Sequence, residues 1–163
     1  MLKQLHIKNF KAWRDTGPVR LAPLTVIFGA NSAGKSSLGH LLLALKQTGL
    51  STDRKRALQL GDDNTFIDLG TFSECIYNHN LEQSLEFDLA WDLPEKLEVK
   101  DTMSGRRYAG TELKLSVEIK ADSRGQPSVH RLSQTLLSDD KNVLSVDYRQ
   151  NEKGKWDIDS RDY

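Results

Sequence analysis

The 163-residue sequence has a single cysteine and no long apolar run, and both shortages narrow what the chain can be. Cys75 has no second cysteine to pair with, which excludes an internal disulfide and a thiolate metal cluster. No run of eighteen apolar residues occurs, and the N-terminal MLKQLHIKNF lacks the apolar core of a signal peptide. These absences predict a cytoplasmic protein that does not enter a membrane.

A net charge is also absent, because 23 basic residues balance 23 acidic ones. Bulk electrostatics therefore gives no argument for binding nucleic acid or an acidic membrane. The charges are unevenly spread, since residues 1–60 hold ten basic and two acidic residues, and residues 61–103 hold two and eleven. The basic first segment suits a site for a polyanionic nucleotide, and it equally suits a solvated charged surface. The four histidines show no metal-ligand spacing.

Three strands are predicted in the first thirty residues. Apolar and polar residues alternate over 2–10, which predicts a strand, and residues 18–22 predict a second short strand after a turn at Gly17. LTVIF at 24–28 is a short apolar run rich in β-branched residues, typical of a strand buried on both faces.

Helical spacing begins after Lys35, where leucines recur every three or four residues. The pattern predicts a helix to about Gln47, with Gly49 as its stop. A second short helix is expected over residues 53–60, with Ser51 or Thr52 as its N-cap.

Beyond these helices the apolar period changes from 3.6 to 2, which predicts a mainly β second half. SRGQP at 123–127 predicts a turn, so the strands should form an antiparallel meander. We expect strands over 85–91, 113–119, 129–137 and 143–148, and a last one near 155–158.

The sequence GANSAGKSS at residues 29–37 fits the phosphate-binding pattern GxxxxGK[ST], between a predicted strand and a predicted helix. Glycines let consecutive backbone N–H groups face phosphate oxygens, and the following helix presents its positive N-terminal end to the same anion. Lys35 is expected to reach the β- and γ-phosphates, and the Ser36 hydroxyl to bind Mg²⁺. The alternative, a chance glycine-rich turn, is disfavoured by the agreement of motif, strand and helix. The predicted nucleotide-binding residues are Gly29, Ala30, Asn31, Ser32, Ala33, Gly34, Lys35, Ser36 and Ser37.

This motif and its surroundings resemble a known family. IKNFKAW followed by LTVIFGANSAGKSSL is similar to the N-terminal signature of ABC-superclass ATPase heads of the SMC, RecF and OLD type, whose P-loop carries an Asn at the position of Asn31. LKQT, LQLGD and DLGTFSECIYN most resemble bacterial AAA-labelled, OLD-like ATPases that have a C-terminal domain of unknown function. The resemblance implies ATP and Mg²⁺ as cofactors and places Lys11 near the phosphates. The sequence around Lys11 equally fits a solvated surface lysine.

The predicted fold class is α/β, a P-loop NTPase lobe of strand, P-loop and helix with an antiparallel β-rich second half. The resemblance makes this the first lobe of an ABC/SMC-type head. We divide the single lobe into a P-loop core over 1–60, an acidic connecting segment with a strand over 61–103, and a β-meander over 104–163.

Hydrolysis in that superclass needs an Asp-Glu pair ending a Walker B strand and a signature motif from a second head, and neither is found. In VLSVDY at 143–148, Tyr148 stands where the catalytic Glu is expected, and the segment predicts a meander strand. MSGRR at 103–107 lacks the second glycine of a signature loop and predicts a turn. DSRG at 122–125 fits the DxxG of GTPases, but no NKxD motif accompanies it. We therefore expect one lobe of a longer chain, which alone binds nucleotide weakly and hydrolyses little or none.

Two functions remain open. The resemblance implies an ATPase head that forms a homodimer or higher oligomer on Mg-ATP and gates an effector such as a nuclease or a DNA-binding partner, in phage defence or DNA repair. The alternative is a non-hydrolysing nucleotide-binding module for assembly or regulation; a small kinase would need an arginine-rich lid that is absent. The preference for ATP over GTP rests on the resemblance, because a P-loop contacts only phosphates. Trp13 can stack on the adenine or pack within the fold.

Overall fold

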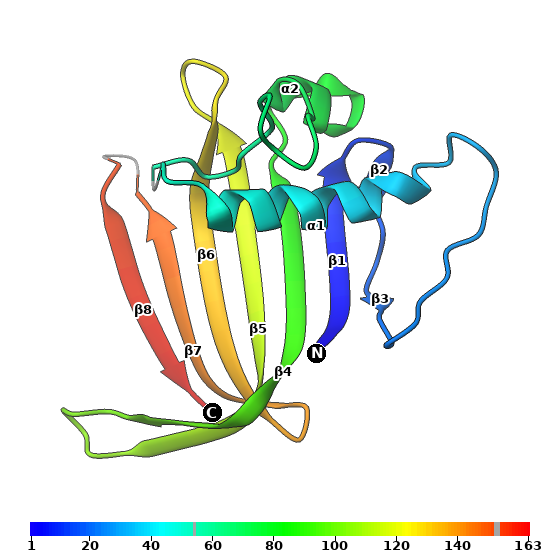
Figure 1. Ribbon diagram of the computed structural model, residues 1–163. Coiled ribbons are helices and arrows are strands. Elements are labelled where there is room, and N and C mark those ends of the chain that lie inside the picture. Colours follow the sequence, from blue (N-terminus) through cyan, green and yellow to red (C-terminus); the bar gives the residue numbers. More distant parts are fainter. Residues whose placement is uncertain (54, 152–153) are drawn as a thin grey trace.

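One large antiparallel sheet organises the fold, as a computed structural model describing residues 1–53, 55–151 and 154–163 shows (Figure 1). In these residues the sheet has eight strands in the order β2-β1-β4-β5-β6-β7-β8, and β3 also pairs with β1. The helical segments are α1 (Lys35–Leu50), α2 (Phe72–Cys75) and the 3₁₀ turn η1 (Tyr77–His79). The strands are β1 (Leu2–Phe10), β2 (Trp13–Asp15), β3 (Val19–Arg20), β4 (Leu85–Lys100), β5 (Arg107–Ala121), β6 (Pro127–Ser138), β7 (Lys141–Gln150) and β8 (Trp156–Asp162).

From β5 onward each strand pairs with the preceding one, which confirms the predicted meander. The apolar alternation restricts the register, because Leu85 lies opposite Ile119 and Phe87 opposite Val117, and a slip of β5 by one residue would turn Ile119 and Val117 to the other face. The predicted turn at 123–127 joins β5 to β6, and Gly125 there has the left-handed φ of 75° that favours glycine. The expected tail strand is also confirmed, as β8.

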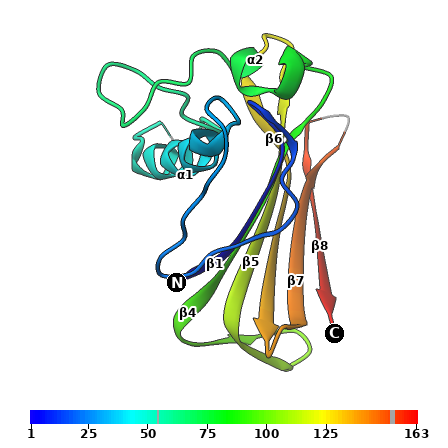
Figure 2. The ribbon, with the colours of Figure 1, turned by 90° about the vertical axis from the view of Figure 1, so that its right-hand side faces the viewer.

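The apolar face of the sheet packs on α1, which crosses the strands on one side and leaves the opposite face open (Figures 1 and 2). Leu38 and Leu41 of α1 belong to the same buried apolar core as Leu5 and Ile7 of β1. The predicted helix is confirmed and continues past Gly49 to Leu50. No helix in the described part of the chain is long and apolar enough to cross a membrane.

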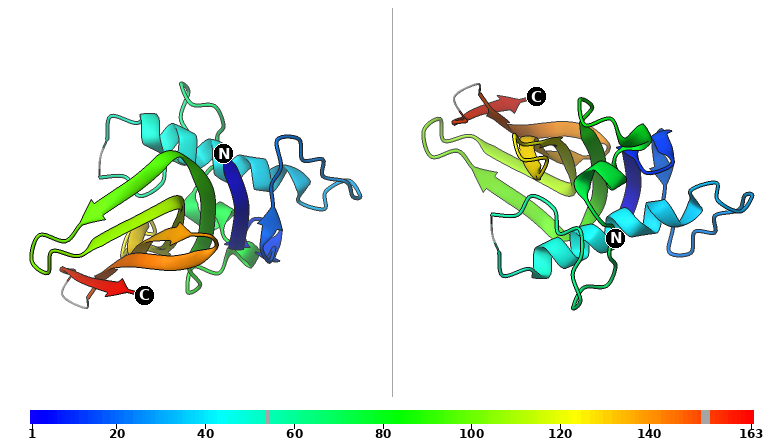
Figure 3. Two further views of the ribbon diagram at one scale, coloured as in Figure 1. Left: turned by 90° about the horizontal axis from the view of Figure 1, so that it is seen from below. Right: turned by 90° about the horizontal axis from the view of Figure 1, so that it is seen from above.

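The β4–β5 hairpin is longer than predicted and folds across the lower end of the sheet towards the C-terminal end of β8 (Figures 1 and 3). A register shift between Asp92 and Leu97 accompanies the bend in β4. Near the tip Arg106 is ion-paired with Asp162 of β8, and the Tyr108 hydroxyl donates to the same carboxylate at 3.2 Å. The turn predicted at MSGRR lies at this tip, so it is a hairpin loop and opens no helix.

The segment Leu24–Phe28, expected to be a buried strand, is neither a strand nor buried, so this prediction was wrong for the described chain. Leu24, Val26 and Phe28 are 81, 60 and 87% exposed. They lie in the arc between β3 and α1 that projects beside the sheet (Figures 1 and 3). A strand buried on both faces needs hydrogen-bonded neighbours and two apolar layers, and the eight strands described here supply neither to this segment.

The helix expected over residues 53–60 is not formed either. Arg54 lies outside the described residues, and the other residues form turns and extended chain. Asp53 accepts hydrogen bonds from the Lys55 N–H and the Arg56 guanidinium, which stabilises a turn in place of a helix. The buried Gln47 amide of α1 then donates to the Gln59 carbonyl at 2.7 Å, which holds the extended segment against the helix.

Candidate functional site

The predicted P-loop leads directly into α1. Residues 29–33 are exposed, and the Ala33 N–H donates to the Ala30 carbonyl at 3.3 Å, which closes a tight turn. Gly34 is the N-cap of α1 and has φ 80° and ψ 10°, a conformation in which any other residue would be strained. A Cβ at this position would also lie 2.7 Å from the Cβ of Ala12. Backbone conformation and packing therefore both require glycine at the second glycine of the motif.

Lys35 folds back over the loop that precedes it. Its ammonium donates to the carbonyl of Gly29 at 2.8 Å and to the carbonyl of Ala30 at 2.6 Å. The cation is thus held on the backbone of the loop itself, at the mouth of the predicted phosphate site. An incoming anion can compete for it, because a phosphate oxygen is a stronger acceptor for an ammonium than a neutral carbonyl.

The N-terminus of α1 is open to an anion. No side chain caps it, and its first turn contains no acidic residue. The Ser36 side chain is exposed there, whereas Ser37 is buried and its N–H already donates to the Gly34 carbonyl at 3.0 Å. The uncapped N–H groups and the helix dipole would favour an anion at this end of the helix.

The β1–β2 turn packs against the P-loop. The Trp13 indole N–H donates to the Gly34 carbonyl at 2.9 Å, and the half-buried ring packs against the apolar core. Lys11 lies in the same turn with a left-handed φ of 49°, and its ammonium donates to the Leu69 carbonyl at 3.4 Å. The structure thus brings the turn next to the predicted site, with the Lys11 ammonium bound to residue 69 and not to the P-loop. The role of Lys11 at the phosphates stays a prediction.

The segment that contains Leu69 and Cys75 is held in place by several hydrogen bonds. The Lys11 N–H donates to the Cys75 carbonyl at 2.7 Å. Burial raises the pKa of the Cys75 thiol to about 11, so this cysteine is protonated and unreactive at neutral pH. The Thr71 N–H and hydroxyl both donate to Glu74, which lowers the pKa of that carboxyl and caps α2. The short α2 was not predicted, although Thr71 and Glu74 have the spacing of a capping box.

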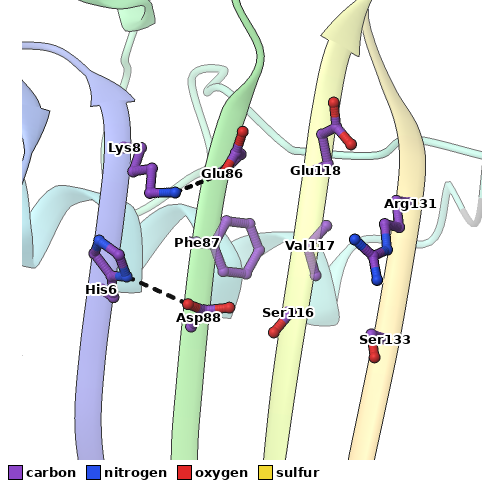
Figure 4. Close-up of a pocket in the computed structure, with 10 residues that line it drawn as sticks. All are labelled: His6, Lys8, Glu86, Phe87, Asp88, Ser116, Val117, Glu118, Arg131 and Ser133. Atoms are coloured by element: carbon purple, nitrogen blue, oxygen red, sulfur yellow. Dashed lines mark hydrogen bonds and ion pairs between the residues drawn. The ribbon is translucent and has the colours of Figure 1, made fainter. Parts of the chain in front are cut away.

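The open face of the sheet carries a second candidate, a depression of about 300 Å³ (Figure 4). It is a polar surface whose charges are paired across strands. Lys8 Nζ lies 3.2 Å from Glu86, and Arg131 lies 2.8 Å from Asp147. Pairing with Glu86 raises the pKa of Lys8, as expected for a cation beside a carboxylate.

His6 also lies on this surface, where its ring is placed between two carboxylates. Its Nε2 is 2.7 Å from Asp15 and its Nδ1 is 3.3 Å from Asp88. The N–H of Gly17 and the His6 ring together hold the pKa of Asp15 below its usual range. Every charge here has a partner, and in the described residues no group of three histidine, cysteine or acidic side chains is arranged to hold a metal. The surface has the character of a cross-strand ion-pair network, and it faces away from α1 (Figure 4).

The acidic residues in the segments that resemble hydrolytic motifs take part in ion pairs or hydrogen bonds within the fold. Val143–Tyr148 lies within β7, as predicted, and the Asp147 carboxylate is engaged by Arg131. Asp122 caps the β5–β6 turn by accepting from the N–H groups of Arg124 and Gln126. Asp147 and Asp122 therefore each have a structural role in the sheet or its turn.

A known family matches almost the whole chain. A family model described as an AAA ATPase domain matches residues 1–157. No curated protein sequence matches the chain. The match identifies a nucleotide-binding ATPase domain, for which ATP and Mg²⁺ are the implied ligands.

Proposed function

The chain belongs to the AAA ATPase domain family, and from this membership we propose that it binds Mg-ATP through residues 29–37 as the first lobe of an SMC/RecF/OLD-like head. One observation carries the proposal: the uncapped N-terminus of α1 lies beside the Lys35 ammonium, which in the described part of the chain is bound only to loop carbonyls. A polyanion that accepts from both replaces weak neutral acceptors with charged ones.

The residues present fit this ligand. Backbone N–H groups of the loop and the first turn would bind the phosphate oxygens, and Lys35 would neutralise part of their charge. The exposed Ser36 hydroxyl is placed on the same turn and would bind Mg²⁺, which bridges the β- and γ-phosphates and draws charge from them. Lys11 would have to leave the Leu69 carbonyl to join them.

We further propose that the head dimerises on Mg-ATP and that this dimer gates an effector such as a nuclease or DNA. The exposed apolar segment Leu24–Phe28 supports the need for more protein around the nucleotide, since such a run is stable only when covered. In this proposal the hydrolytic acid pair and the signature motif belong to segments beyond the 163 residues, in a longer native chain.

A non-hydrolysing nucleotide-binding module is the second candidate. The observation in its favour is that Asp147, the acid in the Walker-B-like segment of β7, is ion-paired with Arg131. In that case nucleotide would stabilise an assembly surface, and no hydrolysis would follow in any form of the protein.

The test has two parts. Isothermal titration of the chain with Mg-ATP, Mg-GTP and ADP measures binding and base preference, and light scattering with and without Mg-ATP measures the mass against the monomer's 18.4 kDa. We expect the chain to release or absorb heat on binding Mg-ATP, and its mass in solution to double. The proposal would be refuted if no nucleotide bound at millimolar concentration. The intact mass of the native gene product then separates the two candidates, because only a longer chain can carry the hydrolytic half.

A further inference from the structure

Gly34, the second glycine of the P-loop motif, is held in place by a side chain from outside the loop. Its carbonyl accepts from the Trp13 indole N–H at 2.9 Å and from the Ser37 N–H at 3.0 Å. The Ser37 bond belongs to the first turn of α1, but the Trp13 bond comes from β2, 21 residues earlier in the chain.

The direction of this carbonyl decides where the next N–H points. A trans peptide is planar, so the Lys35 N–H lies opposite to the Gly34 C=O. With the carbonyl directed into the helix and onto Trp13, the Lys35 N–H must face out of the helix N-terminus, towards the predicted phosphates. A glycine in the left-handed region is otherwise free to rotate, because it has no Cβ to restrict φ and ψ.

Trp13 is a fixed donor because its turn is anchored in the core. Phe10, which pairs with Trp13 across β1 and β2, is completely buried. The turn is also bonded to the segment before η1 through the Lys11 N–H and the Cys75 carbonyl, 2.7 Å apart. A Cβ on Gly34 would lie 2.7 Å from Ala12 and 3.1 Å from Trp13 Nε1, so the turn and the P-loop fit closely.

We propose that Trp13 is a positioning residue for the nucleotide: its indole N–H holds the Gly34–Lys35 peptide in the orientation that binds phosphate. This inference rests on the proposed function of the P-loop. It differs from stacking on the adenine, because the indole N–H is used on the loop itself and the effect acts on the phosphates.

The two roles of Trp13 are separated by a ligand without a base. Trp13→Phe keeps an aromatic ring and removes the donor, and affinity is measured by titration calorimetry for Mg-ATP and for inorganic tripolyphosphate with Mg²⁺. Loss of one neutral hydrogen bond should weaken both ligands equally, by about five-fold. Trp156→Phe on β8, at the opposite edge of the sheet, is the matched control and should leave both affinities unchanged.

The other possible results of these titrations would contradict either the role of Trp13 or the proposed function. A loss seen with Mg-ATP but not with tripolyphosphate would show that Trp13 acts on the nucleoside and not on the phosphates, and it would overturn the inference, as would unchanged affinity for both ligands. Lys35→Ala, measured in parallel, tests the P-loop itself: if it binds as the native chain does, the proposed function fails, and not only the role of Trp13.

If Trp13→Phe does not fold, the native protein still tests the bond. The Trp13 indole N–H should exchange slowly with solvent in NMR spectra and shift when tripolyphosphate is added. Exchange at the rate of a free indole, or a resonance that does not move at saturation, would overturn the inference.

Discussion

Replacing Lys35 with methionine should remove most of the affinity for Mg-ATP and leave the fold intact. Two unit charges about 4 Å apart in a site of effective dielectric constant about 20 attract by about 4 kcal/mol. Lys35 must release the Gly29 and Ala30 carbonyls, at 2.8 and 2.6 Å, before it can bind phosphate. We take this exchange to cost about 1 kcal/mol net. The remaining loss, about 3 kcal/mol, corresponds to an affinity about 150-fold weaker.

Calorimetry with Mg-ATP measures this loss, and Lys46→Met is the matched control. Lys46 is on the same helix about 16 Å further along its axis, where its ammonium lies 4.6 Å from the Phe66 ring. The control should bind as the native chain does, although both variants lose one positive charge. Thermal unfolding should change little in Lys35→Met, because the carbonyls it releases are solvent-exposed. A folded Lys35→Met protein with native affinity would refute the assignment of the site.

Three further predictions follow from single contacts. Ser36→Ala should weaken nucleotide binding in Mg²⁺ but have little effect in chelator, and equal losses in both conditions would argue against the metal role. Because burial raises the pKa of Cys75 to about 11, the unfolded chain ionises first as the pH rises; stability in urea should therefore fall between about pH 9 and 11, by at most about 1.4 kcal/mol per pH unit, relative to Cys75→Ala. A flat difference between these two proteins would contradict that assignment. Leu41→Ala should destabilise the fold by about 2–5 kcal/mol in urea unfolding, since Leu41 is completely buried between α1 and the sheet; a loss below 1 kcal/mol would place the core elsewhere.

The meander could be predicted because its pattern is local. Alternation in β4 and β5 makes one face of each strand apolar, and the antiparallel pairing in which Leu85 meets Ile119 buries both of those faces together. The helix after the P-loop could be predicted for the same reason, since its leucines form one stripe whatever covers it.

Burial of an apolar run, by contrast, is not a local property. Leu24–Phe28 has the composition of an interior strand, yet its neighbours in the described chain do not cover it. The segment at 53–60 has acceptable helix formers, but the Asp53 side chain bonds to nearby donors, and contacts with Gln47 of α1 favour extended chain.

The phosphate-binding motif was determined by the sequence alone, because four spaced residues and a following helix specify how the backbone can meet an anion. The ligand roles of its residues, and that of Lys11, stay predictions until nucleotide binding is measured. Trp13 could not be assigned in this way, since nothing in its spacing distinguishes a ring on adenine from a donor to the loop. Only the tertiary structure showed the bond to the loop, because folding of β1 and β2 brings the indole to the Gly34 carbonyl, and the direction of a hydrogen bond depends on that placement and not on residue type.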